Sequence, residues 1–170
     1  MANKQITDLP VAVSMDGTED IEIVQGGTSK RATAAQIARS RLQEVNTAIE
    51  FVIDEGGLVL NSGVKGYLEI PFDATILTVS LLGDQSGSVV VDIWKCSYTA
   101  FDAGATAPTV ADSITSASPP TIATGTKSRD TSLTGWTTSV DSGDVLAFVV
   151  DSNSNFTRVT VSLGVERLLS

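Results

Sequence analysis

Residues 157–167 read TRVTVSLGVER, and apolar and polar residues alternate along almost the whole stretch. The apolar positions of this alternation are Val159, Val161, Leu163 and Val165. The polar positions between them include Arg158, Thr160, Ser162 and Glu166. Because successive side chains of a strand point to opposite faces, this period of two predicts a half-buried antiparallel strand.

Further strands are predicted upstream of this stretch. The clear candidates are residues 67–72, 75–82, 88–96 and 144–151, and the weaker ones are residues 50–53 and 58–60. Turn-forming residues mark 84–87, 141–143 and 151–155. Roughly seven or eight short strands with no helical period between them predict a mainly β fold, an antiparallel β-sandwich or jelly-roll head over residues 57–170.

Residues 1–41 have a different pattern, which predicts a small N-terminal module. Residues 20–24 and 28–32 are short strand candidates, and Gly26-Gly27 between them is a hairpin turn signal. Thr33 and Gln36 have the spacing of a capping box, so we expect a helix from Ala34 to about Ile49. A hairpin and one helix bury too little surface to be stable alone, which predicts a partner surface for this module.

Four apolar residues toward the end of that helix have coiled-coil spacing. They are Leu42, Val45, Ile49 and Val52. One interpretation is a helical stalk over residues 42–56 whose seam joins subunits. The other is an amphipathic helix that lies on its own domain, because two heptads are fewer than a firm coiled coil needs.

A long segment, residues 99–132, interrupts the regular spacing of strands. It is rich in Ala, Ser, Thr and Gly and contains Pro108, Pro119 and Pro120. A connection of this length is either a binding loop or a Greek-key crossover, here with one short strand around residues 121–123. Both interpretations stay open, and they are compatible.

Composition excludes several classes of function. The 170 residues include no His and one Cys, which excludes Ser-His-Asp triads, Cys-His pairs, His-based zinc sites and CxxC redox motifs. A net charge of −9 repels phosphate backbones, so we expect no nucleic-acid partner. No apolar run reaches the roughly 20 residues that span a bilayer, and the first residues lack a secretory signal pattern. We therefore expect a chain made in the cytoplasm that does not insert into membranes.

Candidate chemical motifs give no catalytic, metal or cofactor site. Residues 151–155 begin like a calcium loop, but Phe156 and Ser162 replace the Gly and Glu of an EF-hand, so an Asx-bonded turn is the better interpretation. Residues 83–87 do not match a GxSxG nucleophile elbow. Several carboxylates could pair in space, for instance Asp92 and Asp151, but their spacing does not mark a glycosidase acid and base.

The remaining distinctive residues are expected to pack rather than react. Trp94 and Trp136 could each stack on a sugar ring, but in a chain this poor in aromatic residues we expect them to anchor the core. Cys96 is expected to be a small core residue. We therefore expect that the protein is not an enzyme.

Two parts of the sequence resemble bacteriophage virion proteins. Ile6-Thr7-Asp8-Leu9-Pro10 and residues 17–33, GTEDIEIVQGGTSKRAT, resemble the N-terminal module of phage tail-fibre, tailspike and appendage proteins, which attaches those proteins to the particle. A second set resembles a β-sandwich domain of phage and prophage structural proteins. It comprises residues 70–76 (IPFDATI), 82–95 (LGDQSGSVVVDIWK), 109–114 (TVADSI), 133–136 (LTGW) and 144–146 (DVL).

The resemblance implies a trimeric, fibre-like virion structural protein with an N-terminal anchor, a short stalk and a β-rich head. It favours the coiled-coil interpretation of the stalk, and it implies other virion proteins as partners of the anchor. The chain lacks shaft repeats and β-helix periodicity, so a small appendage fits better than a tailspike.

The resemblance leaves three functions to compare. The first is attachment to a host-surface glycan or protein through the loops of the head. The second is a head fibre or capsid decoration protein. The third is an enzyme that degrades cell-surface polysaccharide, which the missing His and the unmarked carboxylates disfavour.

Overall fold

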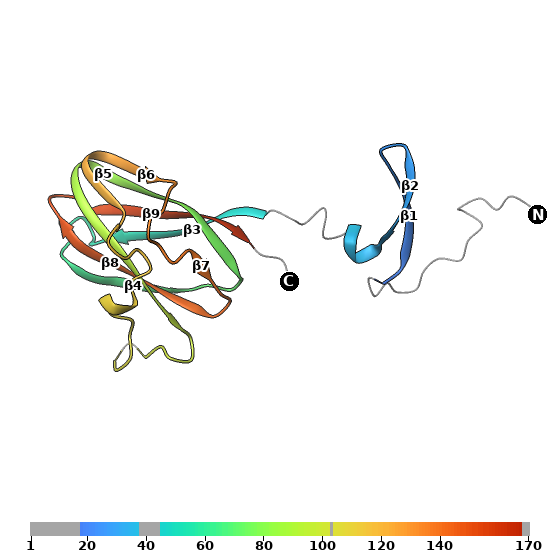
Figure 1. The fold of residues 1–170 in the computed structure, drawn as a ribbon. Coiled ribbons are helices and arrows are strands. Elements are labelled where there is room, and N and C mark those ends of the chain that lie inside the picture. Colours follow the sequence, from blue (N-terminus) through green and yellow to red (C-terminus); the bar gives the residue numbers. More distant parts are fainter. Residues whose placement is uncertain (1–17, 38–44, 103, 168–170) are drawn as a thin grey trace, which may run out of the picture. The chain divides into compact units, whose positions relative to one another are not determined.

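A computed structural model describes residues 18–37, 45–102 and 104–167 of the chain. The chain divides into two compact units, of which the first ends at Gln43 and the second begins at Glu44. The described part is mainly β, as the sequence predicts, and its strands pair antiparallel throughout (Figure 1).

The first unit contains the predicted hairpin. Strands β1 (Asp20–Gln25) and β2 (Thr28–Thr33) pair over their whole length. Gly26 and Gly27 connect them with φ angles of 61° and 76°. Two consecutive residues in the left-handed region are what a tight hairpin turn requires, and glycine adopts that region without strain.

The predicted capping box is confirmed at the end of β2. The Thr33 hydroxyl accepts a hydrogen bond from the Gln36 amide at 3.1 Å, and the Gln36 side chain accepts one from the Thr33 amide at 2.8 Å. A helical turn follows at Ala34 and is described as far as Ile37. The predicted continuation of this helix to Ile49 is wrong, because a strand begins at Val45.

That strand, β3 (Val45–Asp54), replaces the predicted helical stalk. Ile49 and Ile53 are buried, whereas Val52 is 55% exposed on the opposite face, so Ile49 and Val52 do not share one seam. Leu42 lies outside the described residues. The helical interpretation fails because β3 pairs along ten residues with β9 (Arg158–Arg167), and the period of two of a strand puts Ile49, Phe51 and Ile53 on one face and Val52 on the other.

The second unit is one curled antiparallel sheet. Its other strands are β4 (Gly63–Glu69), β5 (Ala74–Ser97), β6 (Thr121–Asp130), β7 (Ser139–Val140) and β8 (Asp144–Asn153). The strands follow the order β3-β9-β5-β8-β4, and β6 and β7 also pair with β5. A short 3₁₀ helix, η2 (Val110–Asp112), lies in the long segment between β5 and β6.

Strand β5 is the organising element of the sheet. Its first part, from Ala74 to Gly83, pairs with β9, and its second part, from Val89 to Ser97, pairs with β8. The sequence predicts two strands separated by a turn at residues 84–87, and the structure instead has one strand of 24 residues. These turn-type residues bend β5 without reversing it, because β6 pairs with it on both sides of the bend.

The bend depends on close contacts with the loop between β8 and β9. A Cβ atom added at Gly83 would lie 2.1 Å from the Phe156 ring, and one added at Gly87 would lie 1.9 Å from the Asn155 side chain. Asn155 donates a hydrogen bond to the Ser86 carbonyl at 2.8 Å, and the Thr157 hydroxyl bonds to Asp84. This last bond lowers the pKa of the Asp84 carboxyl.

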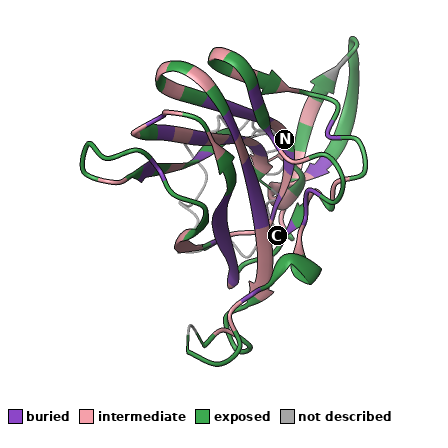
Figure 2. Cartoon of the chain, turned by 90° about the vertical axis from the view of Figure 1, so that its left-hand side faces the viewer, coloured by how far each residue is buried: buried purple, intermediate pink, exposed green. Residues whose placement is uncertain are grey.

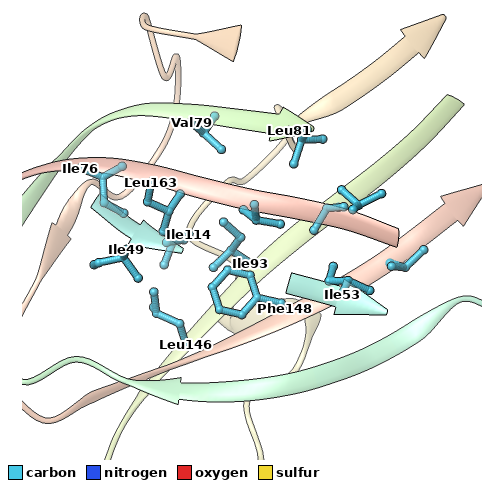
Figure 3. Packing of buried hydrophobic residues seen from close by; sticks show 14 of the residues in the cluster. Ile49, Ile53, Ile76, Val79, Leu81, Ile93, Ile114, Leu146, Phe148 and Leu163 are labelled. Atoms are coloured by element: carbon cyan, nitrogen blue, oxygen red, sulfur yellow. The ribbon is translucent and has the colours of Figure 1, made fainter. Parts of the chain in front are cut away.

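The two halves of the curled sheet face each other across the hydrophobic core (Figure 3). Phe51 of β3 stacks on Phe148 of β8 with 4.3 Å between ring centroids and 5° between ring planes. Gly66 of β4 leaves room for this stack, since a Cβ there would lie 2.7 Å from the Phe51 ring. Burial alternates along β9, whereas β8 is buried without a break from Asp144 to Val150; Figure 2 shows both banded and continuously buried strands. The predicted inward positions of β9 are confirmed, with Val159, Val161, Leu163 and Val165 at most 1% exposed.

Substitution of Gly83 by Ala tests the bend. The added methyl group must displace the fully buried Phe156 ring, so we expect Gly83→Ala to lower the free energy of unfolding by about 1–3 kcal/mol. Urea denaturation followed by circular dichroism measures the change. Gly104→Ala is the matched control, because its Cβ would make only an ordinary contact of 3.5 Å with Asp102. Equal stability of the two variants would contradict the close packing at the bend.

Candidate binding surface

The loop between β3 and β4 presents two adjacent apolar side chains to solvent. Leu58 is 71% exposed and Val59 is 54% exposed. They follow Gly56 and Gly57, whose φ angles of 66° and 88° turn the chain sharply after β3. Large apolar side chains held in solvent on a loop are typical of contact surfaces. We call residues 55–62 the apolar loop.

Hydrogen bonds hold the apolar loop at its start. The Asp54 carboxylate accepts a bond from the Gly56 amide at 2.6 Å, and Arg158 donates to the same carboxylate at 2.5 Å. The bond from Arg158, followed by the one from Gly56, lowers the pKa of Asp54.

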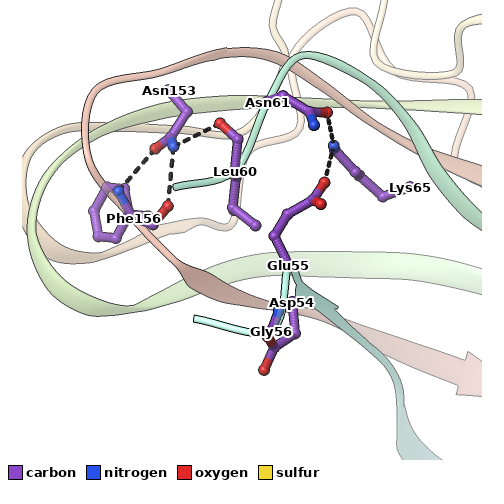
Figure 4. A network of polar contacts seen from close by, with 8 residues as sticks. All are labelled: Asp54, Glu55, Gly56, Leu60, Asn61, Lys65, Asn153 and Phe156. Carbon is purple, nitrogen blue, oxygen red and sulfur yellow. Dashed lines mark hydrogen bonds and ion pairs between the residues drawn. The ribbon is translucent and has the colours of Figure 1, made fainter. Parts of the chain in front are cut away.

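An ion pair also holds the loop. The Lys65 side chain is 8% exposed, and its Nζ lies 2.5 Å from the Glu55 carboxylate and also bonds to Asn61 (Figure 4). The ion pair therefore joins the two arms of the loop.

A second set of contacts fixes the loop after its apolar tip. Leu60 is 3% exposed, and its amide donates to the Phe156 carbonyl at 2.9 Å. The Asn153 side-chain amide donates to the carbonyls of Leu60 and Phe156 at 2.9 and 3.0 Å. Leu58 and Val59 are thus exposed on a loop whose neighbours are anchored in the core. Such pre-organisation reduces the entropy lost on binding.

The weak strand candidate at residues 58–60 lies in this loop, and the structure has no strand there, so that prediction is wrong. The signal that identifies a loop is the pair Gly56-Gly57. The exposure of Leu58 and Val59 depends on Leu60 turning inward, and a single sequence does not show which of three adjacent apolar residues does so.

The long segment 99–132 is attached to the sheet through Asp92. This carboxylate is 5% exposed and accepts hydrogen bonds from the Ser113 hydroxyl at 2.8 Å and the Thr115 hydroxyl at 2.5 Å. It also accepts bonds from the Trp94 ring nitrogen at 2.6 Å and the Ile93 amide at 2.7 Å. With four donors on its two oxygens, Asp92 is a structural acceptor that pins the segment to β5.

The Greek-key crossover interpretation of this segment is wrong, because the segment joins β5 to β6 and β6 pairs with β5 itself as its antiparallel neighbour. Part of the segment packs inward. Ile114 and Ile122 are 3% and 1% exposed in the core. The predicted short strand at 121–123 is the start of β6, which continues to Asp130. The binding-loop interpretation stays a prediction. Val110, within the segment, is 71% exposed. Tyr98, the residue that precedes the segment, is 62% exposed.

A small groove lies between residues 118–120, just before β6, and the second half of β6. It is lined by Val79, Ser118, Pro119, Pro120, Thr121, Ser128, Arg129 and Asp130. The Trp136 ring nitrogen donates to the Ser118 carbonyl at 2.9 Å, and the ring packs against the core. Trp136 therefore supports the wall of the groove, in line with the predicted anchoring role. Trp94 is half-buried beside Asp92.

The other candidate motifs are also placed by the structure. The Asn153 side chain accepts the Phe156 amide at 3.1 Å, so residues 151–155 contain the predicted Asx-bonded turn. Cys96 is half-buried, and burial, with the nearby Asp112 and Asp144 charges, raises the pKa of its thiol. Among residues 18–37, 45–102 and 104–167, no three potential metal-ligating side chains cluster. No helix in these ranges is long and apolar enough to cross a membrane.

The charge of the buried Asp92 acts on the carboxyl group of Asp151. Partial burial, and secondarily the Asp92 charge, raise the pKa of the Asp151 carboxyl. Deprotonation of Asp151 is thus less favourable in the folded chain than in the unfolded one. Its contribution to stability is complete below the ordinary pKa of 3.8 and is lost as pH rises through the folded-state value.

Asp151→Asn removes this unfavourable charge. We expect the variant to be more stable than the wild type at neutral pH, and we expect the difference to disappear below about pH 3.8. Thermal unfolding between pH 3 and pH 7 measures the effect. Ser152→Ala, at the exposed neighbouring position, changes no ionisable group and is the control that should show no pH-dependent gain. A gain at Asp151 that grows as the pH falls would contradict the assigned interaction.

The described surface thus offers the apolar loop and the exposed part of the long segment as regions for contact with a partner. No protein-family model, curated protein or solved structure matches the chain. The function therefore has to be inferred from these two regions and from the division of the chain into two units.

Proposed function

We propose that the chain is a bacteriophage virion structural protein, a short trimeric fibre or tail appendage that contributes to attachment to the host surface. The first unit attaches the protein to another virion protein, and the second unit is the head that meets the host. In this proposal the curled sheet is a jelly-roll-type β-sandwich. The protein acts by contact rather than by catalysis, and it is located on the virion.

The first unit supports an anchoring role. A two-stranded hairpin with a helical turn buries little surface of its own, and Ala32 is its one buried hydrophobic residue in the described range 18–37. Charged side chains of both signs, Asp20, Glu22 and Arg31 among them, surround an open hollow on its surface. A unit of this kind gains stability by docking on a larger protein.

The observation that carries the attachment role is the apolar loop of the second unit. Its tip exposes Leu58 and Val59, while Asp54, Lys65 and Asn153 hold its two arms in place. Exposure of apolar side chains on a pre-organised loop is costly in an isolated protein, and contact with a partner offsets that cost.

The double variant Leu58→Asp with Val59→Asp tests this role. Both side chains are exposed, so we expect little change in thermal stability. Purified wild-type chain, added in excess, should slow the adsorption of the particles that carry it to host cells. The double variant should compete at least about tenfold less well, because two charges replace the apolar contact.

Leu77→Asp, an exposed apolar residue of β5 outside both regions, is the control and should compete like the wild type. Equal competition by wild type and double variant would contradict the role of the loop. Density for the chain on the capsid by electron microscopy would favour a decoration protein instead. Release of sugars from host polysaccharide by the purified chain would contradict the non-enzymatic role.

A further inference from the structure

Four strands of the second unit, in the order β3-β9-β5-β6, expose one face on the side opposite to the core. Cross-strand pairing arranges its side chains in rows. One row consists of Glu50, Ser162, Ser80 and Arg129, and the next consists of Val52, Thr160, Leu82 and Lys127. We call these eight residues the outer face.

The two margins of the outer face carry opposite charges. Glu50 lies on β3 at one margin, and Lys127 and Arg129 lie on β6 at the other. Among the described residues these three side chains form no ion pair. Glu50 accepts a weak bond from Ser162 at 3.3 Å, and Arg129 donates to Ser80 at 2.9 Å. The charges are thus available to a partner.

The centre of the outer face consists mostly of short side chains and is partly apolar. Ser80, Ser162 and Thr160 have short side chains, and Ser80 is only 8% exposed, so Leu82 is the one large side chain that the middle two strands, β9 and β5, contribute to these eight residues. Val52 and Leu82 are 55% and 52% exposed in the same row. A flat face of this kind allows the close approach of another sheet.

The outer edges of β3 and β6 are also unpaired in the described chain, since β3 pairs only with β9 and β6 only with β5. Unpaired edge strands are usually protected by Lys, Pro or a covering element. The ten residues of β3, VNTAIEFVID, contain neither Lys nor Pro. This edge therefore has the character of a strand that pairs with another chain.

We propose that three copies of the chain associate through the outer face around a three-fold axis parallel to the strands. Each β3 then lies beside β6 of the next copy. The two strands run in opposite directions, because three antiparallel pairings separate them in the sheet order, so they can form an antiparallel ladder. This inference rests on the trimer of the proposed function and specifies its contact.

Rotation about the three-fold axis does not change the position of any residue along that axis. Glu50 and Arg129 belong to the same row, so Glu50 of one copy lies opposite Arg129 of the next. The acidic margin therefore meets the basic margin at each of the three contacts. A contact between two different surface regions closes a ring, whereas a two-fold contact would need one self-complementary region.

Strand spacing favours three copies. Four strands at about 4.8 Å each make a side of roughly 19 Å, which places each sheet of a triangular prism about 5.5 Å from the axis. This is close to half of the ~10 Å that separates packed sheets. Four copies would place each sheet roughly 9.5 Å from the axis and leave the small central side chains without contact.

Charge exchange in the full chain tests this arrangement. Wild type should have three times the chain mass by light scattering. Glu50→Lys and Arg129→Glu should each raise the concentration at which the trimer dissociates by about tenfold or more, because each creates three like-charged contacts. The double variant Glu50→Lys with Arg129→Glu should restore the trimer. Glu69→Lys, at an exposed position on β4 outside the outer face, should leave it unchanged.

Circular dichroism of each variant confirms that it is folded, and the rescue by the double variant excludes a general loss of structure. A monomeric wild type, or a double variant no more associated than the single ones, would overturn the inference. A trimer that depends on this charge pair but occurs nowhere on the virion would overturn the proposed function and leave this contact standing.

Discussion

The fold of the second unit depends on the bend of a single strand, β5. One 24-residue strand pairs with β9 before the bend and with β8 after it, so both halves of the sheet share one backbone. Gly83 and Gly87 permit the bend because Phe156 and Asn155 occupy the space that a Cβ would need. The stacked rings of Phe51 and Phe148 then close the core between the halves.

The same bend gathers the elements that we associate with function. Asn153 at the end of β8 and the Phe156 carbonyl of the loop that packs into the bend hold Leu60 and thereby the apolar loop. Beyond the bend, Asp92 of β5 pins the long segment between β5 and β6 to the sheet. The strand that closes the core therefore also fixes the two regions that we expect to contact partners, while its first half contributes to the outer face.

Sequence patterns predicted the parts of the fold that local chemistry determines. The alternation in β9 and the capping box of Thr33 and Gln36 depend on neighbouring residues alone, and the structure confirms both. The helical stalk was wrong because the apolar residues around Ile49 fit two periods, and pairing with β9 selects one of them. The turn at residues 84–87 was wrong because contacts from residues 154–157, about 70 positions away, keep that stretch extended. The apolar loop was missed because its exposure depends on the inward position of Leu60.

Native-state hydrogen exchange of the full chain tests most directly whether β5 holds the two halves together. If one bent strand holds both halves of the sheet together, the slowest-exchanging amides of segments 76–82 and 89–96 should have the same free energy of opening at every urea concentration. Both segments should then open in one cooperative step. Slow amides of one segment that open at lower free energy than those of the other would show two independent halves. That result would contradict a fold that depends on β5.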